Sequence, residues 1–224
     1  MKLNAFVINL GLAFVLFDQT LHGQQNVADD RQIANTRAKA EQGGADAQFT
    51  LGYYYAVGLG VAKDEVEALK WYRKAAEQNL ATAQFNLGSC YDQGQGIAKN
   101  MAEAVNWYRK AADQNLAEAQ FSLGVCYKRG EGVVQNDVEA VKWYRKAAEQ
   151  NYANAQFNLA LCCIRGQGVA QDDAEGYKWL LLSSAQGFEQ AKNAVTKLDV
   201  GLSGEQIEKG KQRANNWLEQ HKKP

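Results

Sequence analysis

Residues 83–112 read AQFNLGSCYDQGQGIAKNMAEAVNWYRKAA, and near copies of this stretch begin at Ala47, Ala119 and Ala155. The copies are 36 residues apart, which keeps their aromatic residues in register. The aligned residues are Phe49, Phe85, Phe121 and Phe157 in the first half of each copy, and Trp71, Trp107, Trp143 and Trp179 in the second half. A fixed period of this length is the sequence signature of a repeat protein, in which neighbouring units stack along a line.

Each unit is predicted to be a pair of helices joined by a glycine turn. In the second copy, apolar residues recur at helical spacing on one face of each half: Ala83, Leu87, Cys90 and Tyr91, then Ala104, Trp107, Ala111 and Ala112. Gly94 and Gly96 separate the two halves, because glycine adopts the positive φ that follows a helix end. One hairpin cannot bury its apolar face alone, so the units are expected to stack into a solenoid.

Three glycines interrupt the first helices, at positions 52, 88 and 124. A glycine inside a helix costs about 1 kcal/mol relative to alanine, so we expect it to permit a close approach of two helices. The ring of a phenylalanine or a tryptophan is expected to fill the space beside it, and both aromatic series are expected in the core. Ala160 holds this position in the fourth unit, where we expect a slightly looser contact.

The pattern A-Q-F-x-L-G-x-x-Y-x-x-G-x-G-V-x-x-D-x-x-E-A-x-x-W-Y-R-K-A-A resembles the Sel-1-like repeat, a relative of the tetratricopeptide repeat with a longer loop between its helices. The resemblance covers residues 45–188, as four repeats of 36 residues. It implies an all-α fold, a right-handed α/α superhelical solenoid of helical hairpins. It also implies that the concave groove of this solenoid holds a peptide or protein partner.

The ends of the chain differ from the repeats. Lys2 followed by the 13 apolar residues AFVINLGLAFVLF is typical of a signal peptide, here residues 1–23, and is too short to cross a membrane. Residues 24–44 are predicted to be a linker and an N-terminal capping helix, with Ile33 in the core. Residues 189–224 are predicted to form C-terminal capping helices. We therefore expect a secreted or periplasmic protein with no transmembrane span.

The C-terminal cap is predicted to contain a helix that starts at Ser203, since Gln206 follows at capping-box spacing. Its buried face is expected to include Ile207, Ala214, Trp217 and Leu218. Its solvent side is expected to carry Glu208, Lys209, Lys211, Arg213 and Glu219. Polar outer caps of this kind keep a solenoid soluble.

Composition excludes several classes of function. With 25 basic and 25 acidic residues the net charge is zero, so we expect no nucleic-acid partner. The two histidines, His22 and His221, lie near the chain ends, which argues against histidine-based triads and metal sites. No G-x-S-x-G or Walker A motif occurs, so we expect no enzyme activity, cofactor, metal or small-molecule substrate.

The four cysteines suggest packing rather than chemistry. Cys90, Cys126 and Cys162 recur every 36 residues, on successive helices too far apart for a disulfide. They are expected to be small buried side chains, although the vicinal pair with Cys163 leaves a redox or soft-metal role open. Some cysteine-rich Sel-1-like proteins staple each hairpin with a disulfide, and the resemblance aligns those positions with Ala76 and Gln84, Ala112 and Gln120, and Ala148 and Gln156.

The candidate binding residues are those that vary between units. The related tetratricopeptide fold lines its groove with the first helices, and carrying that register over predicts a groove. Its residues are Thr50, Tyr53, Asn86, Ser89, Gln93, Ser122, Val125, Lys128, Arg129, Asn158, Leu161 and Arg165. Tyr53 is expected to be exposed. The basic residues near Lys128, Arg129 and Arg165 favour a peptide or protein partner with an acidic segment.

The sequence therefore predicts a non-enzymatic adaptor or scaffold. Two alternatives remain open. One is a secreted hydrolase of the β-lactamase-like type suggested for cysteine-rich relatives. The other is a glycan- or exopolysaccharide-associated envelope protein, which only aromatic residues such as Tyr53 support.

Overall fold

The computed structural model describes residues 30–221, and this part of the chain forms eleven α-helices and no strand. The helices are α1 (Asp30–Glu41), α2 (Ala45–Val57), α3 (Glu65–Glu77), α4 (Ala81–Gln93), α5 (Met101–Asp113), α6 (Ala117–Arg129), α7 (Asp137–Glu149), α8 (Ala153–Arg165), α9 (Asp173–Ala185), α10 (Glu189–Gly201) and α11 (Gly204–Gln220). None of these helices is long and apolar enough to span a membrane. The predicted signal peptide and the start of the linker lie outside the described residues.

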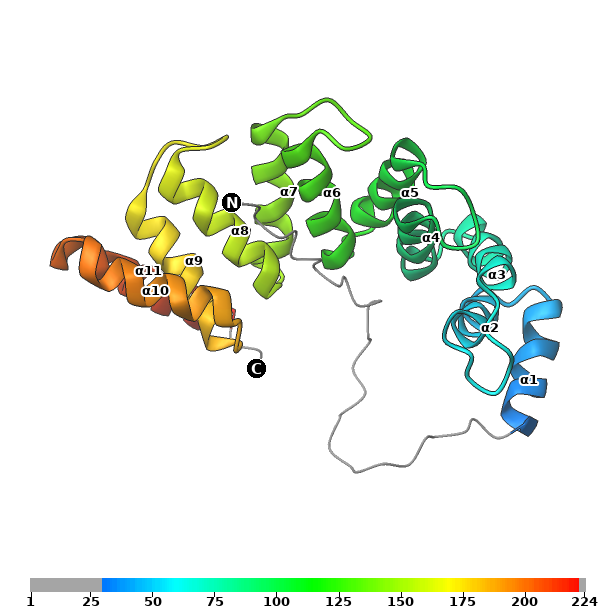
Figure 1. The fold of residues 1–224 in the computed structure, drawn as a ribbon. Helices are drawn as coiled ribbons and strands as arrows, with labels where there is room; N and C mark the ends of the chain where they lie inside the picture. The colour runs from blue at the N-terminus through cyan, green and yellow to red at the C-terminus, as the bar shows by residue number, and fades with distance from the viewer. Residues whose placement is uncertain (1–29, 222–224) are drawn as a thin grey trace, which may run out of the picture.

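The helices stack as successive hairpins into an arc, with α1 at one end and α10 and α11 at the other (Figure 1). The first helices of the hairpins, α2, α4, α6 and α8, lie on the inner side of the arc, and their partners α3, α5, α7 and α9 lie on the outer side. The predicted fold class, a right-handed superhelical solenoid of helical hairpins, is confirmed.

The glycine turns have two distinct tasks. Gly94 ends α4 in the left-handed conformation, with φ of 74°, and its N–H is bonded to the carbonyl of Cys90. Gly96 also has a positive φ, and a Cβ atom there would overlap the backbone oxygen of Glu65 at the start of α3. Gly132 and Gly168 approach the start of the preceding second helix in the same way, so the second glycine of these turns lets one hairpin sit directly on the previous one.

The mid-helix glycines do permit close approach, but the ring beside them is a tyrosine. A Cβ atom on Gly88 would lie 2.8 Å from the ring of Tyr108, and Gly52 and Gly124 face Tyr72 and Tyr144 in the same way. The expected phenylalanine or tryptophan is thus wrong. The expected looser contact at Ala160 is also wrong, because Gly176 on α9 supplies the missing space, with a Cβ position 3.0 Å from the backbone oxygen of Ala160.

The aromatic core differs from the prediction in the same way. Tyr72, Tyr108 and Tyr144 are buried, as are Phe85 and Phe121, whereas Phe49, Phe157, Trp71, Trp107 and Trp143 are only half-buried. Tryptophan and tyrosine are adjacent in α3, α5 and α7, so they point about 100° apart. The tyrosine faces the hairpin partner, and the tryptophan faces the outer side between neighbouring hairpins.

Both ends of the solenoid carry polar side chains where the repeats carry core residues. Helix α1 aligns with the second helices and buries Ile33, as predicted, but it places Gln32, Thr36 and Lys39 where α3 has Ala68, Tyr72 and Ala75. Helix α10 keeps the register of a first helix and exposes Asn193 and Thr196 at the positions of Phe157 and Ala160. These substitutions remove the apolar surface on which a further hairpin would stack.

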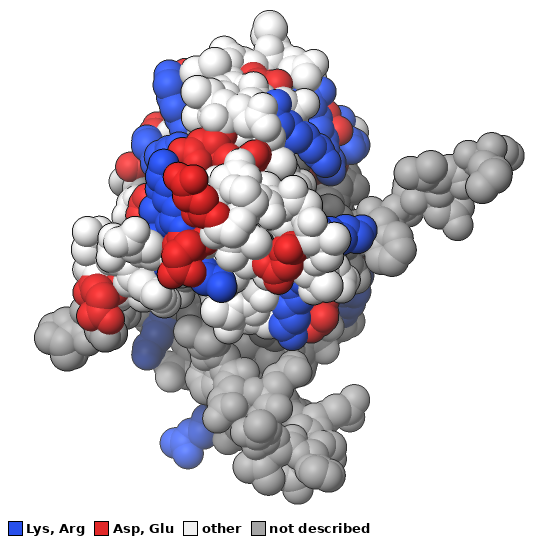
Figure 2. Space-filling view, turned by 90° about the vertical axis from the view of Figure 1, so that its left-hand side faces the viewer, with Lys and Arg blue, Asp and Glu red and all other residues white. Residues whose placement is uncertain are grey.

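Helix α11 packs mainly against α9, and not against α10 as the second helix of a hairpin would. Ser203 and Gln206 form the predicted capping box, and Ala214 and Trp217 are buried. Two expectations for this helix are wrong: Leu218 is 45% exposed, and Arg213 turns inward to pair with Asp172 and Glu175. Figure 2 shows acidic and basic residues interleaved over this end of the molecule.

Candidate partner-binding surface

The predicted groove residues all lie on α2, α4, α6 and α8, the helices on the inner side of the arc (Figure 1). We use the term inner face for the residues of α2, α4, α6 and α8 that differ from one repeat to the next. Three of them are buried: Asn86, Ser89 and Ser122 are 6%, 7% and 6% exposed. Gly88 and its equivalents allow the two helices of each hairpin to approach closely. These short side chains therefore pack within the hairpin and offer a partner little surface.

Ser89 shows what such a residue does. Its hydroxyl donates to the backbone oxygen of Phe85 at 3.2 Å and lies 3.4 Å from the hydroxyl of Tyr108. The Tyr108 hydroxyl also donates to Asp92 at 3.2 Å. The equivalent hydroxyl of Tyr72 is buried and has no hydrogen-bond partner within the described part of the chain, because Tyr53 and Ala56 replace Ser89 and Asp92 in the first repeat.

The amino end of the inner face is largely uncharged. Thr50 donates its hydroxyl to the backbone oxygen of Asp46 at 2.8 Å, and Gln93 is exposed. Tyr53, which we expected to be exposed, is half-buried and packs on the cores of the first two repeats. The three consecutive tyrosines are accommodated because Tyr55 accepts a hydrogen bond from Arg37 while Tyr54 is buried.

The carboxyl end of the inner face is basic, but its cations are not equivalent. Lys128 is half-buried and donates to Asp137 at 3.1 Å and to Gln167 at 3.0 Å, so its charge is already matched. Arg129 is exposed and lies 4.0 Å from Glu131. Arg165 is exposed and has no carboxylate within 4 Å among residues 30–221. Asn158, Val125 and Leu161 are half-buried around these charges.

A ladder of side-chain amides, which the sequence reasoning missed, joins the repeats along one edge. Gln120 donates from Nε2 to the backbone oxygen of Ala112 at 3.2 Å and to Asn115 at 3.0 Å, and it accepts from Gln150 at 2.7 Å. The same set recurs around Gln84 and Gln156. The recurrence of glutamine in every A-Q-F segment was the available signal.

The amide ladder occupies the positions at which the resemblance places disulfides in cysteine-rich relatives. Gln84, Gln120 and Gln156 donate to the carbonyls of Ala76, Ala112 and Ala148, the aligned partner positions. A hydrogen bond therefore joins each pair of positions here. The asparagines that complete the ladder, Asn79, Asn115 and Asn151, adopt positive φ in the turns between repeats.

The four cysteines are free and buried, as expected for small packing residues. Burial raises the pKa of Cys90 and of Cys126 to about 12, and that of Cys163 to about 11. The thiolate is the reactive form of cysteine, so these groups are poor nucleophiles and poor metal ligands. Within residues 30–221, no group of histidine, cysteine and carboxylate side chains could hold a metal ion.

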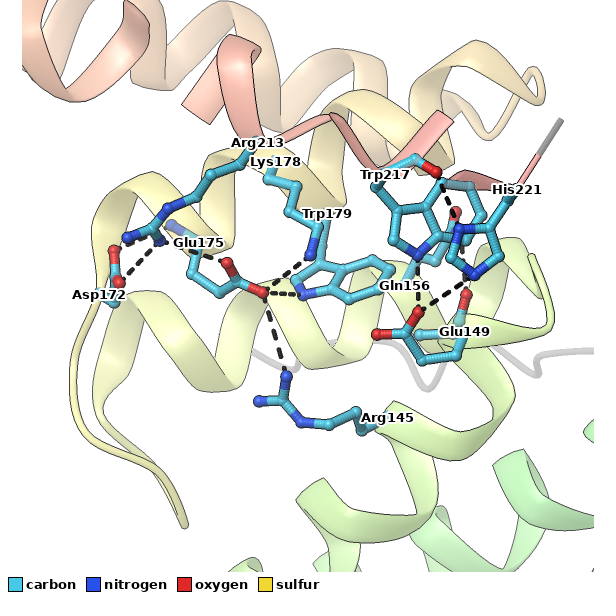
Figure 3. A network of polar contacts seen from close by, with 11 residues as sticks. Arg145, Glu149, Gln156, Asp172, Glu175, Lys178, Trp179, Arg213, Trp217 and His221 are labelled. Atoms are coloured by element: carbon cyan, nitrogen blue, oxygen red, sulfur yellow. Dashed lines mark hydrogen bonds and ion pairs between the residues drawn. The ribbon is translucent and has the colours of Figure 1, made fainter. Parts of the chain in front are cut away.

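Figure 3 shows a network of polar contacts that joins α11 to α7 and α9. Glu175 accepts from the indole N–H of Trp179 at 2.8 Å and from Arg213 at 3.2 Å. Glu149 accepts from the indole N–H of Trp217 at 2.6 Å, and the His221 ring stacks on that indole at 4.0 Å. Among residues 30–221, His221 contacts the backbone oxygen of Trp217 and the carboxylate of Glu149 and no nucleophile, and the network holds α11.

Comparison with known proteins identifies the repeats. A family model described as Sel1 repeat matches residues 45–80, 81–116, 117–152 and 153–188. The crystal structure of a protective antigen of uropathogenic Escherichia coli that displays an SLR fold is 36% identical, with a TM-score of 0.75; the match covers 84% of this chain and 40% of that protein. A Sel1 repeat protein from Oxalobacter formigenes is 39% identical over 75% of this chain and 70% of its own, with a TM-score of 0.71. A search of curated proteins found no match.

Proposed function

The chain belongs to the Sel1 repeat family, whose members are generally protein-interaction scaffolds, and from this we propose that it is a non-enzymatic adaptor that holds a protein partner against its inner face. The observation that carries the proposal is the division of labour within each repeat. Residues that recur in every unit build the turns, the tyrosine contacts and the amide ladder. Many residues that change from unit to unit lie on the inner helices, and those that are exposed there, such as Gln93, Arg129 and Arg165, are free to address a partner.

The charge distribution supports a partner with an acidic segment. The carboxyl end of the inner face carries Arg129 and Arg165, and arginine suits carboxylates because its planar guanidinium can bind them with two parallel hydrogen bonds. Lys128 contributes less than its sequence position suggests, because it already pairs with Asp137. A rigid stack of helices presents these groups without reorganisation, which lowers the entropic cost of binding.

The proposal is tested by crosslinking and affinity capture from the native cell envelope. The variant Arg129→Glu with Arg165→Glu should lose the partners that the wild-type chain captures, while helicity by circular dichroism stays unchanged. Lys211→Glu on α11 is the matched control, since it also reverses an exposed charge but lies away from the inner face. Equal capture by all three proteins would contradict the proposed inner-face site.

We also propose that the protein works outside the cytoplasm, in the secreted or periplasmic fraction. The support is the basic and apolar start of the sequence, together with thiols that are buried and have raised pKa values. Such thiols resist oxidation in an oxidising compartment. Mass spectrometry of the protein from fractionated cells tests this, and a full-length cytoplasmic chain would contradict it.

No observation favours the hydrolase or glycan alternatives. The buried thiols and the stacked His221 offer no activated nucleophile, and Tyr53 presents only part of its ring. Turnover of a chromogenic lactam, abolished by a single serine or cysteine substitution, would overturn the adaptor proposal.

A further inference from the structure

Most basic side chains of the described chain already have a partner. Lysines and arginines pair with carboxylates, Arg73 and Arg109 donate to tyrosine hydroxyls, and four lysines lie over indole rings. Arg165 and Lys197 are exposed, and neither lies within 4 Å of a carboxylate of residues 30–221. Both belong to the last two inner helices, α8 and α10.

The repeat register places Lys197 on the inner side of the solenoid. Helix α10 spans Glu189–Gly201, which is α8 shifted by 36 residues, and it packs against α9 as α8 packs against α7. Lys197 therefore takes the place that Leu161 holds on α8. This residue was not among the sequence-predicted groove residues, because the repeat pattern fades after residue 191.

The two cations flank apolar surface and no acid. Leu161 and Ile164 of α8 are half-buried within about one helical turn of Arg165, and Lys197 lies on α10 at the register position of Leu161. The acidic residues of α10 already have other partners: Glu189 pairs with Lys192, and Asp199 accepts a hydrogen bond from Tyr177. The inner face at α8 and α10 thus combines uncompensated positive charge with aliphatic side chains.

We propose that this surface binds an extended segment of a protein partner in which an aspartate or glutamate lies two residues from a large apolar side chain. The inference rests on the proposed function and names the chemistry of the partner at that same face. The acidic residue pairs with Arg165, Lys197 adds a second positive charge on the neighbouring inner helix, and the apolar residue covers Leu161 and Ile164.

The spacing of the segment follows from helix and strand geometry. Leu161 and Arg165 are four residues apart on one helix, which separates them by about 6 Å along its axis. Alternate residues of an extended chain point the same way and are about 6.6–6.8 Å apart. A carboxylate over Arg165 and an apolar group over Leu161 therefore correspond to positions i and i+2 of the ligand.

The test uses a library of random dodecapeptides displayed on phage and selected on the purified protein at low salt. Peptides selected by the wild-type chain should be enriched in an acidic residue two positions from Leu, Ile or Phe. Arg165→Glu and Lys197→Glu should each bind these peptides about tenfold more weakly, and added salt should weaken wild-type binding. Lys211→Glu should select the same peptides as the wild type.

A second experiment reverses the charge of the selected peptides. Synthetic versions of the selected peptides with lysine in place of the acid should lose binding to the wild type and regain it on the double variant Arg165→Glu, Lys197→Glu. Selected peptides without an acid, or binding unaffected by both substitutions, would overturn the inference. So would a library that yields no peptide above uncoated beads, whereas capture of a native partner by the wild type alone would still support the proposed function.

Discussion

Trp143 and Trp179 are equivalent in sequence but end in different surroundings. Trp143 is half-buried on the outer side, and the amino group of Lys146 lies 4.0 Å from its ring centroid. Trp179 is fully buried, because Leu182 stands where the other repeats have that lysine and α11 lays Trp217 against the ring at 6.0 Å. The repeat tryptophan is therefore half-buried at the surface in the third repeat and part of the core in the fourth. The difference arises because α11 covers the fourth repeat.

Replacing each tryptophan by alanine is expected to give the largest difference in stability between the third and fourth repeats. Trp179→Ala leaves a cavity under α11 and should lower the free energy of unfolding by about 3–5 kcal/mol. Trp143→Ala removes a half-buried ring and should cost about 1–2 kcal/mol, since less apolar area is lost. Urea titrations followed by circular dichroism measure both. Equal losses would show that α11 does not protect Trp179.

The next comparison exchanges the residues at the equivalent positions 146 and 182, three residues after the tryptophan in each repeat. Leu182→Lys places an ammonium group at a site that is 3% exposed, so either the charge is buried or α11 is displaced. We expect a loss of about 2–3 kcal/mol and rapid proteolysis of residues 204–221. The reciprocal change Lys146→Leu removes only a contact to the half-buried ring of Trp143 and should alter stability by about 0.5–1 kcal/mol.

These surroundings could not be predicted from the sequence, for a geometrical reason. The 36-residue period identified the hairpins, and the glycine turns located their ends. Which of two adjacent aromatic residues faces the partner helix depends on the rotation of the helix about its axis. Gly88 and Ala104 set that rotation through a close approach, and it selected Tyr108 over Trp107.

The sequence predicted where α11 begins, at the Ser203 cap, but not how it packs. The repeat would start a second helix at residue 209, but α11 starts at Gly204, because Leu202 replaces the first glycine of the turn. Trp217 consequently lies two residues beyond the repeat position, and its partners come from α7 and α9. Burial of Asn86, Ser89 and Ser122 on the inner face has a similar origin, since variation between units does not report depth.

A third test concerns the fit of α11 itself. A Cβ atom on Gly210 would lie 2.8 Å from the ring of Tyr177 and 3.0 Å from the backbone oxygen of Ala174. Gly210→Ala should therefore push α11 away from α9 and cost about 1–2 kcal/mol, seen as lower urea midpoints and faster amide exchange in α11. Gly204→Ala is the control on the same helix: its Cβ position is open, so stability should be unchanged or slightly higher. Equal effects of the two alanines would contradict a tight α11–α9 contact.

The smallest expected effect tests the charges that hold α11. Partial burial raises the pKa of Asp172, but the hydrogen bonds from Arg213 and from the backbone N–H of Glu175 outweigh it, so the folded pKa lies below the ordinary value. The resulting stabilisation is present above the unfolded pKa, near 4, and is lost as the pH falls through the folded value. Because Asp172 is 42% exposed, the contribution should be about 0.5 kcal/mol.

Asp172→Asn isolates that contribution from the second task of this residue, which is to cap α9. Asn100 and Asn136 cap α5 and α7 at the equivalent position, so a carboxamide preserves the hydrogen bond to the backbone. The variant should lose about 0.5 kcal/mol at pH 7, and this loss should shrink as the pH falls through the folded pKa of Asp172. Asp64→Asn makes the same exchange at the cap of α3, to which α11 supplies no arginine, and is the matched control. If both variants behaved alike across this range, the Arg213 contact would contribute nothing, and the burial of Trp179 would rest on the packing of Trp217 and Gly210 alone.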